Sequence, residues 1–124
     1  MRMSRKVFDG LVERAIADLP ERFALWLDEV AVIVEDEPSP ALRRTLGVDE
    51  EGDLLGSYHG VALTRRSVGD DLQMPDQIML FRRPLMKMCK SEEELADEIR
   101  ITLLHELGHY AGLDEDDLED LGYG

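Results

Sequence analysis

Apolar residues in the first part of the chain follow the spacing of helices and then of a strand. After Ser4, which can cap a helix, apolar side chains recur at three- and four-residue intervals through Val7–Leu19. Pro20 interrupts this pattern and suits the first turn of a second, short helix. The β-branched run Val30–Val34 has the composition of a buried strand. The chain is therefore predicted to begin with two helices followed by a strand.

The middle of the chain predicts further short strands. Leu54–Tyr58 and Val61–Thr64 flank Gly60 and are predicted as two strands around a tight turn. Ile78–Phe81 is wholly apolar, so we expect it in the centre of the sheet. Arg83–Pro84 is expected to end that strand. Val61–Thr64 is then the segment that we expect at an exposed sheet edge.

A long helix is predicted near the end of the chain. Ser91 is followed three residues later by Glu94, which is the pattern of a capping box, and Gly112 is expected to stop the helix after Ala111. Helices, then strands, then a late helix indicate an α+β fold with helices against one face of a mixed sheet. The length of 124 residues fits one domain, residues 1–124, with a single core.

Charge and composition exclude several classes of protein. The chain has 14 basic and 28 acidic residues and a net charge of −14, so phosphate backbones would repel it and no nucleic-acid partner is expected. No apolar run approaches the roughly 20 residues that span a bilayer, so no membrane partner is expected. Met1–Gly10 has no apolar signal core, and Cys89 is the only cysteine, so it has no partner for an internal disulfide. We therefore expect a cytoplasmic protein. The sequence leaves the oligomeric state open, and a monomer is our working expectation.

The late helix carries a pattern that is typical of a metal site. His105-Glu106-Leu107-Gly108-His109 is H-E-x-x-H, and histidines four apart lie one turn apart on one helix face, so both imidazoles can meet one cation. Glu106 lies about 100° round from His105, where it can take a proton from water instead of binding the metal. On a helical wheel the histidines lie outside the apolar arc of the helix. That arc contains Ile99, Leu103, Leu104, Leu107, Tyr110 and Ala111.

Two further positions extend the motif. Gly112 follows His109 by three residues and Glu115 follows it by six. A shuffled chain of this composition would match the extended pattern about once in 7,000 times. Glycine allows the helix to end and the chain to turn back, which can bring a carboxylate to a third corner of a tetrahedron. The fourth corner would stay open for water.

The extended motif resembles that of the zincin metallopeptidases, and nearly the whole chain resembles a family of small bacterial zincin-like metallopeptidases. Outside the motif helix, the similar stretches are Leu11–Ala15, Val30–Asp36, Leu54–Gly60, Leu63–Ser67, Pro75–Ile78 and Leu80–Leu85. The resemblance implies a minimal zincin fold, with N-terminal helices and a small mixed sheet packed on a long C-terminal active-site helix. It also implies a zinc ion and hydrolysis of a peptide or protein substrate.

By this resemblance, His105 and His109 are zinc ligands and Glu106 is the general base. The third ligand position is His or Asp in such families, whereas this chain has Glu115. The neighbouring carboxylates of Asp114, Asp116 and Asp117 compete with Glu115 for the role. The alternative interpretation of this segment is a solvated acidic end of the chain.

A second interpretation of the same motif remains open. The protein is then a non-catalytic zinc-binding module with a degenerate or structural site, and its acidic surface docks a basic partner. A water in the fourth coordination position would favour the enzyme, whereas a fourth protein ligand would favour the structural site. The sequence singles out no group that would stabilise an oxyanion. The candidates are His59, Tyr58, Tyr110 and Tyr123.

Overall fold

The computed structural model describes residues 3–46, 54–60, 76–112 and 116 of the chain. These residues form helices and a three-stranded sheet. The helices are α1 (Arg5–Ala17), α2 (Glu21–Leu27), α3 (Pro40–Leu46), α4 (Arg82–Met88) and α5 (Glu92–Tyr110), and the strands are β1 (Val30–Glu35), β2 (Gly56–His59) and β3 (Asp76–Phe81).

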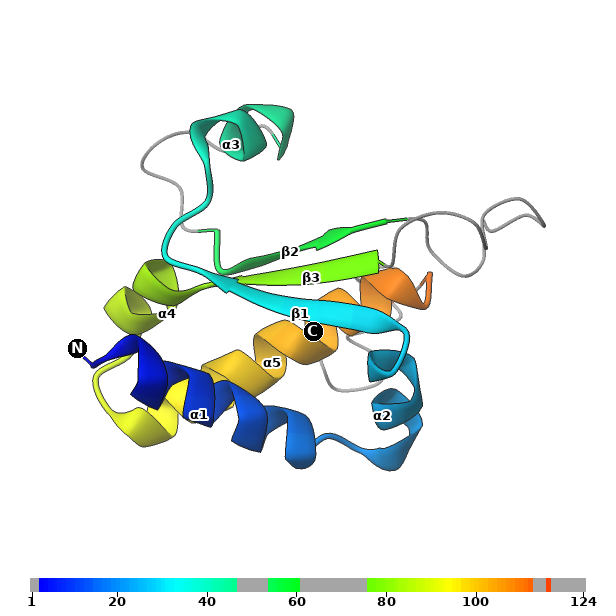
Figure 1. Cartoon of the computed structure of the whole chain (residues 1–124), viewed down its shortest axis with the longest axis horizontal. Helices are drawn as coiled ribbons and strands as arrows, with labels where there is room; N and C mark the ends of the chain where they lie inside the picture. Colours follow the sequence, from blue (N-terminus) through cyan, green and yellow to red (C-terminus); the bar gives the residue numbers. More distant parts are fainter. Residues whose placement is uncertain (1–2, 47–53, 61–75, 113–115, 117–124) are drawn as a thin grey trace.

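The first helix begins where the sequence predicts it. The Ser4 hydroxyl accepts a hydrogen bond from the Val7 backbone N–H at 3.2 Å, which satisfies one of the free donors of the first turn. The buried face of α1 consists of Phe8, Leu11, Val12 and Ala15, which belong to the apolar pattern of the sequence, whereas Val7 of the same pattern is exposed. α1 packs against α5 (Figure 1).

The sheet is mixed and has the order β1-β3-β2. β1 runs parallel to β3, with Val30 opposite Asp76, and β2 runs antiparallel to β3, with Gly56 opposite Leu80. β3 is the central strand, as its wholly apolar run predicts, and Ile78, Leu80 and Phe81 are fully buried. The sheet and its helices confirm the predicted α+β fold.

The long helix α5 has the predicted ends. The Ser91 hydroxyl accepts a hydrogen bond from the Glu94 N–H at 3.1 Å, and the Glu94 carboxylate accepts one from the Lys90 N–H at 2.6 Å. Beyond Tyr110 the chain leaves the helix through Gly112, whose φ of 82° is a conformation that favours glycine. α1 and α5 lie together on one side of the sheet, and α3 lies on the other side (Figure 1).

The structure corrects some of the sequence-based expectations. The sequence pattern does not predict α3 and α4. Each has a proline in its first turn, and a proline in the sequence can equally indicate the end of a strand. Pro40 occupies the first position of α3, and Pro84 lies in the first turn of α4, where a missing N–H costs nothing. The strand predicted at Leu54–Tyr58 begins at Gly56 and pairs with β3. Its predicted hairpin partner, Val61–Thr64, lies outside the described residues.

Candidate metal centre

The last turns of α5 bring the motif residues together. The Nε2 atoms of His105 and His109 are 3.1 Å apart, and the two ring centroids are 4.9 Å apart. One potential ligand atom each from His105, Glu106 and His109 lies within 4.8 Å of the others. The one-turn spacing thus places both imidazoles and a carboxylate around one point, as the sequence predicts.

The rest of α5 holds these side chains at the edge of the core. The apolar arc of the helix is buried, with Ile99, Leu103 and Leu107 fully inaccessible to solvent. Both histidines are half-buried, and Glu106 is 9% exposed. The core therefore anchors the back of the helix while the imidazoles remain within reach of a ligand.

A second anchor lies directly after His109. The Tyr110 hydroxyl donates a 2.5 Å hydrogen bond to the Glu29 carboxylate, which follows α2. The Tyr110 ring makes edge-on contacts with Trp26 and Tyr58, at centroid distances of 6.4 and 6.2 Å. These contacts attach the end of α5 to α2 and β2, so the helix cannot rotate freely about its axis.

The geometry of the histidine pair fits a small divalent cation. Two nitrogen ligands of one tetrahedral zinc ion, each at about 2.05 Å, are about 3.3 Å from one another. The observed Nε2–Nε2 distance of 3.1 Å is close to that value. Two imidazoles with an adjacent carboxylate are also the donor types that zinc takes at catalytic sites.

A cavity of about 260 Å³ adjoins the histidine pair. Its lining includes His105 and Glu106 from the motif, Leu55 directly before β2, and Gly56 at the start of β2. The remaining lining residues are Glu98, Ile101 and Thr102 of α5. No sequence motif singles out these three, although a helical wheel places Glu98 only about 20° from His105, on the histidine face.

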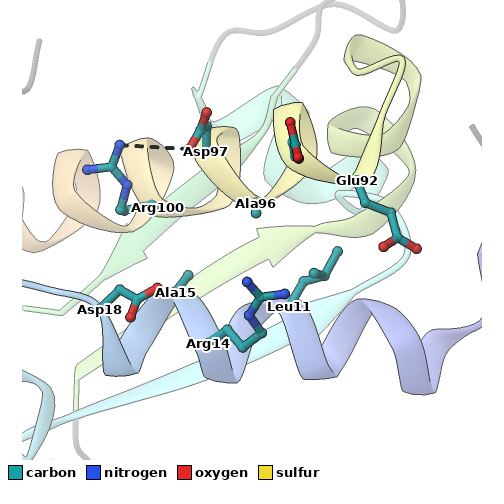
Figure 2. A pocket seen from close by; sticks show the side chains of 9 residues that line it. Leu11, Arg14, Ala15, Asp18, Glu92, Ala96, Asp97 and Arg100 are labelled. Atoms are coloured by element: carbon teal, nitrogen blue, oxygen red, sulfur yellow. Dashed lines mark ion pairs between the residues drawn. The ribbon is translucent and has the colours of Figure 1, made fainter.

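A larger cavity near α5 is a different one. It has a volume of about 580 Å³ and lies between α1 and the first half of α5, where Arg14, Asp97 and Arg100 contribute to its lining (Figure 2). None of the motif residues lines it. We therefore assign the candidate site to the smaller cavity, because the motif residues His105 and Glu106 line it and do not line the larger one.

Comparison with known proteins identifies the family of the chain. The profile of a family described as zincin-like metallopeptidases matches residues 27–124. The chain belongs to this zincin-like metallopeptidase family. A solved structure of a conserved hypothetical protein from Thermus thermophilus is similar to this chain, with 27% sequence identity and a TM-score of 0.55. The match covers 96% of this chain and 97% of that protein. A search of curated proteins finds no match.

Membership of the family is consistent with the fold of the chain and implies a metal ion. A three-stranded mixed sheet beside a long C-terminal helix fits a minimal zincin-like fold. The family implies a divalent metal, typically zinc, and His105, Glu106 and His109 are residues of this zincin-like chain that could bind one. Among its described helices, none is both long and apolar enough to cross a bilayer.

The third ligand stays a prediction. Glu115, which the motif spacing favours, lies outside the described residues, as do its competitors Asp114 and Asp117. Asp116 is described and is exposed. The histidine pair and Glu106 are thus the part of the predicted site that the structure brings together.

Two of the candidates for stabilising an oxyanion, Tyr58 and His59, are neighbours on β2 and face opposite sides of the sheet. Gly56 and Tyr58 face α5, because a Cβ on Gly56 would touch Thr102 and the Tyr58 ring contacts Tyr110. Side chains alternate along a strand, so His59 points to the opposite face of the sheet, where its ring bonds Ser57 at 2.7 Å. This orientation removes His59 from the candidates.

Two of the tyrosines considered for stabilising an oxyanion use their hydroxyl groups in hydrogen bonds to carboxylates. The Tyr58 hydroxyl donates to the Asp76 carboxylate at 2.6 Å, and Tyr110 bonds Glu29 and is buried, as its place in the apolar arc predicts. Tyr123 lies outside the described residues. The described contacts of Tyr58 and Tyr110 are those of packing residues.

Proposed function

We propose that this protein is a zinc-dependent peptidase that hydrolyses peptide bonds with Glu106 as general base. His105 and His109 would hold the ion, and Glu115 would be the third ligand. The observation that carries the proposal is the convergence of His105, Glu106 and His109 within 4.8 Å, on the helix that carries the family motif.

The chain's own residues suit the proton transfers of amide hydrolysis. When bound, a zinc ion supplies Lewis acidity, which favours attack by water near neutral pH and polarises a carbonyl. The Glu106 carboxylate would accept the proton that the attacking water loses as the new C–O bond forms. The same proton then passes to the amide nitrogen as the C–N bond breaks, which leaves a carboxylic acid and an amine. The second water proton then moves from the acid to the amine, so the products are a carboxylate and an ammonium group.

The proposal also covers the substrate class, the domain organisation, the oligomeric state and the compartment. The net charge of −14 supports a peptide or protein substrate and argues against nucleic acid. The length of the chain supports a single catalytic domain over residues 1–124, and we propose a monomer that acts in the cytoplasm. An acidic enzyme of this kind would attract cationic peptides more strongly than anionic ones.

Three variants and two measurements test the proposal. Metal content is measured by mass spectrometry after zinc loading and desalting, and hydrolysis is measured with a mixed library of quenched fluorescent peptides. His109→Ala should lose the bound zinc, whereas His59→Ala, which removes a histidine from the far face of β2, should keep it. Glu106→Gln should retain zinc and lose at least about 100-fold in rate, which is the ordinary contribution of a general base.

Each outcome has a defined meaning. Unchanged zinc content in His109→Ala would refute the ligand assignment, and full activity in Glu106→Gln would remove that residue from the mechanism. Zinc retained by the natural chain together with no hydrolysis of any library member would favour the non-catalytic zinc-binding module.

A further inference from the structure

The cavity beside the histidine pair is lined mainly by one face of α5. Three of its α5 residues, Glu98, Ile101 and Thr102, precede His105 on the same helix face. Leu55 and Gly56 form the opposite wall. At about 260 Å³ the cavity is large enough for one long side chain but not for a bulky ligand.

Gly56 determines how closely β2 lies against α5 at one end of the cavity. A Cβ on Gly56 would come within 2.7 Å of Thr102 Cγ2 and 2.9 Å of the Met79 carbonyl oxygen. Only glycine therefore allows β2 to approach the helix this closely. The close approach fixes one end of the cavity between Gly56 and Thr102.

The remaining walls combine apolar surface with a carboxylate at each end, Glu98 at one and Glu106 of the motif at the other. Ile101, which is 39% exposed, and the half-buried Leu55 supply apolar surface. Glu98 supplies a half-buried carboxylate, and no lysine or arginine is among the described residues that line this cavity. The nearby Arg100 lines the other cavity, where it pairs with Asp97 at 3.9 Å (Figure 2).

We infer that this cavity is a specificity pocket for a basic side chain next to the cleaved bond, with Glu98 as the residue that recognises the cation. The inference rests on the proposed peptidase function and adds the substrate class. Ile101 and Leu55 would pack against the aliphatic stem of a lysine or arginine, and the Glu98 carboxylate would accept hydrogen bonds from its charged head.

The length of the pocket suits such a side chain. Glu98 precedes His105 by seven residues, so the two lie about 10 Å apart along the helix axis. An extended lysine places its charge about 6 Å from its own Cα, because its ammonium sits on a four-carbon stem. A lysine or arginine next to the reacting carbonyl would therefore cover more than half of this separation, and the Glu98 side chain would cover the remainder. A short polar side chain would leave too large a gap.

The test compares peptides that differ only in charge at one position. Fluorescein-labelled hexapeptides carry lysine, norleucine or glutamate at the third position, where norleucine keeps the stem and lacks the ammonium. Their binding to the full-length, metal-depleted chain is measured by fluorescence anisotropy, so cleavage does not interfere. Cleavage of the same peptides by the zinc-loaded chain is measured separately as kcat/KM.

We expect the natural chain to bind the lysine peptide about fivefold more tightly than the norleucine peptide, as for a partly exposed ion pair, and high salt should reduce this preference. Glu98→Gln should abolish the preference, and Glu98→Lys should reverse it in favour of the glutamate peptide. The matched control is Asp97→Asn, which removes a carboxylate one residue away in the other cavity and should leave the preference unchanged.

The outcomes separate this inference from the proposed function. If the natural chain does not distinguish lysine from norleucine, or if Glu98→Gln keeps the full preference, the pocket assignment is wrong even where the zinc-loaded chain cleaves peptides. If the preference is present and depends on Glu98 while no peptide is cleaved, the pocket stands and the peptidase proposal fails.

Discussion

Replacing Gly56 with alanine should destabilise the fold, because the new methyl group has no room between β2 and α5. Its Cβ would lie 2.7 Å from Thr102 Cγ2 and 2.9 Å from the Met79 carbonyl oxygen. Neither atom can move cheaply: Thr102 is 7% exposed and lies in the middle of α5, and the Met79 carbonyl belongs to the central strand. The strand and the helix would have to separate.

The net effect follows from two opposing terms. Overpacking of a filled site costs about 1–3 kcal/mol, and two contacts this short place Gly56→Ala in the upper part of that range. Replacing glycine also lowers the conformational entropy of the unfolded chain, which stabilises the folded state by about 0.4–1 kcal/mol. We therefore expect the free energy of unfolding to fall by about 2 kcal/mol.

Gly10→Ala provides the matched control. Gly10 lies inside α1, and a Cβ there would meet nothing within 4 Å. The same chemical change should therefore raise the free energy of unfolding by about 0.5–1 kcal/mol, which is the helix preference for alanine over glycine. The two substitutions should have opposite signs.

Urea denaturation followed by circular dichroism measures both variants, with the midpoint compared at an unchanged slope. Adding Thr102→Ser to Gly56→Ala removes Cγ2 and should recover part of the loss, while the contact with the Met79 carbonyl remains. An alanine variant at position 56 that is as stable as the natural chain would refute the close approach of β2 to α5.

Three further predictions concern contacts away from the cavity. Tyr110→Phe should lower the free energy of unfolding by about 1 kcal/mol in the same assay, since it deletes the hydrogen bond to Glu29; an unchanged midpoint would contradict that bond. The Arg82 hydrogen bond and charge lower the pKa of Asp36 below its unfolded value, so Asp36→Asn should be less stable at pH 7. That difference should shrink as the pH falls below about 4, and a difference independent of pH would count against the pair. Burial raises the pKa of the Cys89 thiol, so a thiol reagent at pH 8 should react much more slowly with the folded chain than in urea; equal rates would mean an accessible thiol.

The elements that the sequence predicts well are those set by local chemistry. Ser4 and Ser91 cap α1 and α5 with their own hydroxyls, and each cap is read from residues no more than four positions away. The buried β3 is predicted from its unbroken apolar run. Pro40 and Pro84 mislead because proline can either end an element or open a helix, and the sequence around them does not decide between the two.

The difference between local and long-range contacts also explains which parts of the candidate site the sequence predicts. The His105–His109 pair depends only on the pitch of one helix, so the spacing alone predicts that the imidazoles meet. The adjoining cavity depends on Gly56 meeting Thr102, two residues that are far apart in the chain and that no local pattern connects. Glu98 was visible on the helical wheel, but its role becomes apparent only when β2 supplies the facing wall.

The contacts on either side of the histidine pair restrain the helix that carries the candidate metal ligands. Thr102, just before His105, meets Gly56 of β2, and Tyr110, just after His109, meets Glu29 and the aromatic rings of Trp26 and Tyr58. These two contacts restrain α5 on both sides of the imidazoles, so its rotation and its sliding along the sheet are both limited. Ligands held in this way lose little further freedom when an ion binds, which is a main requirement for a tight and specific site. The close approach at Gly56 therefore does two things: it restrains the helix that carries the histidines, and it closes one end of the pocket beside them.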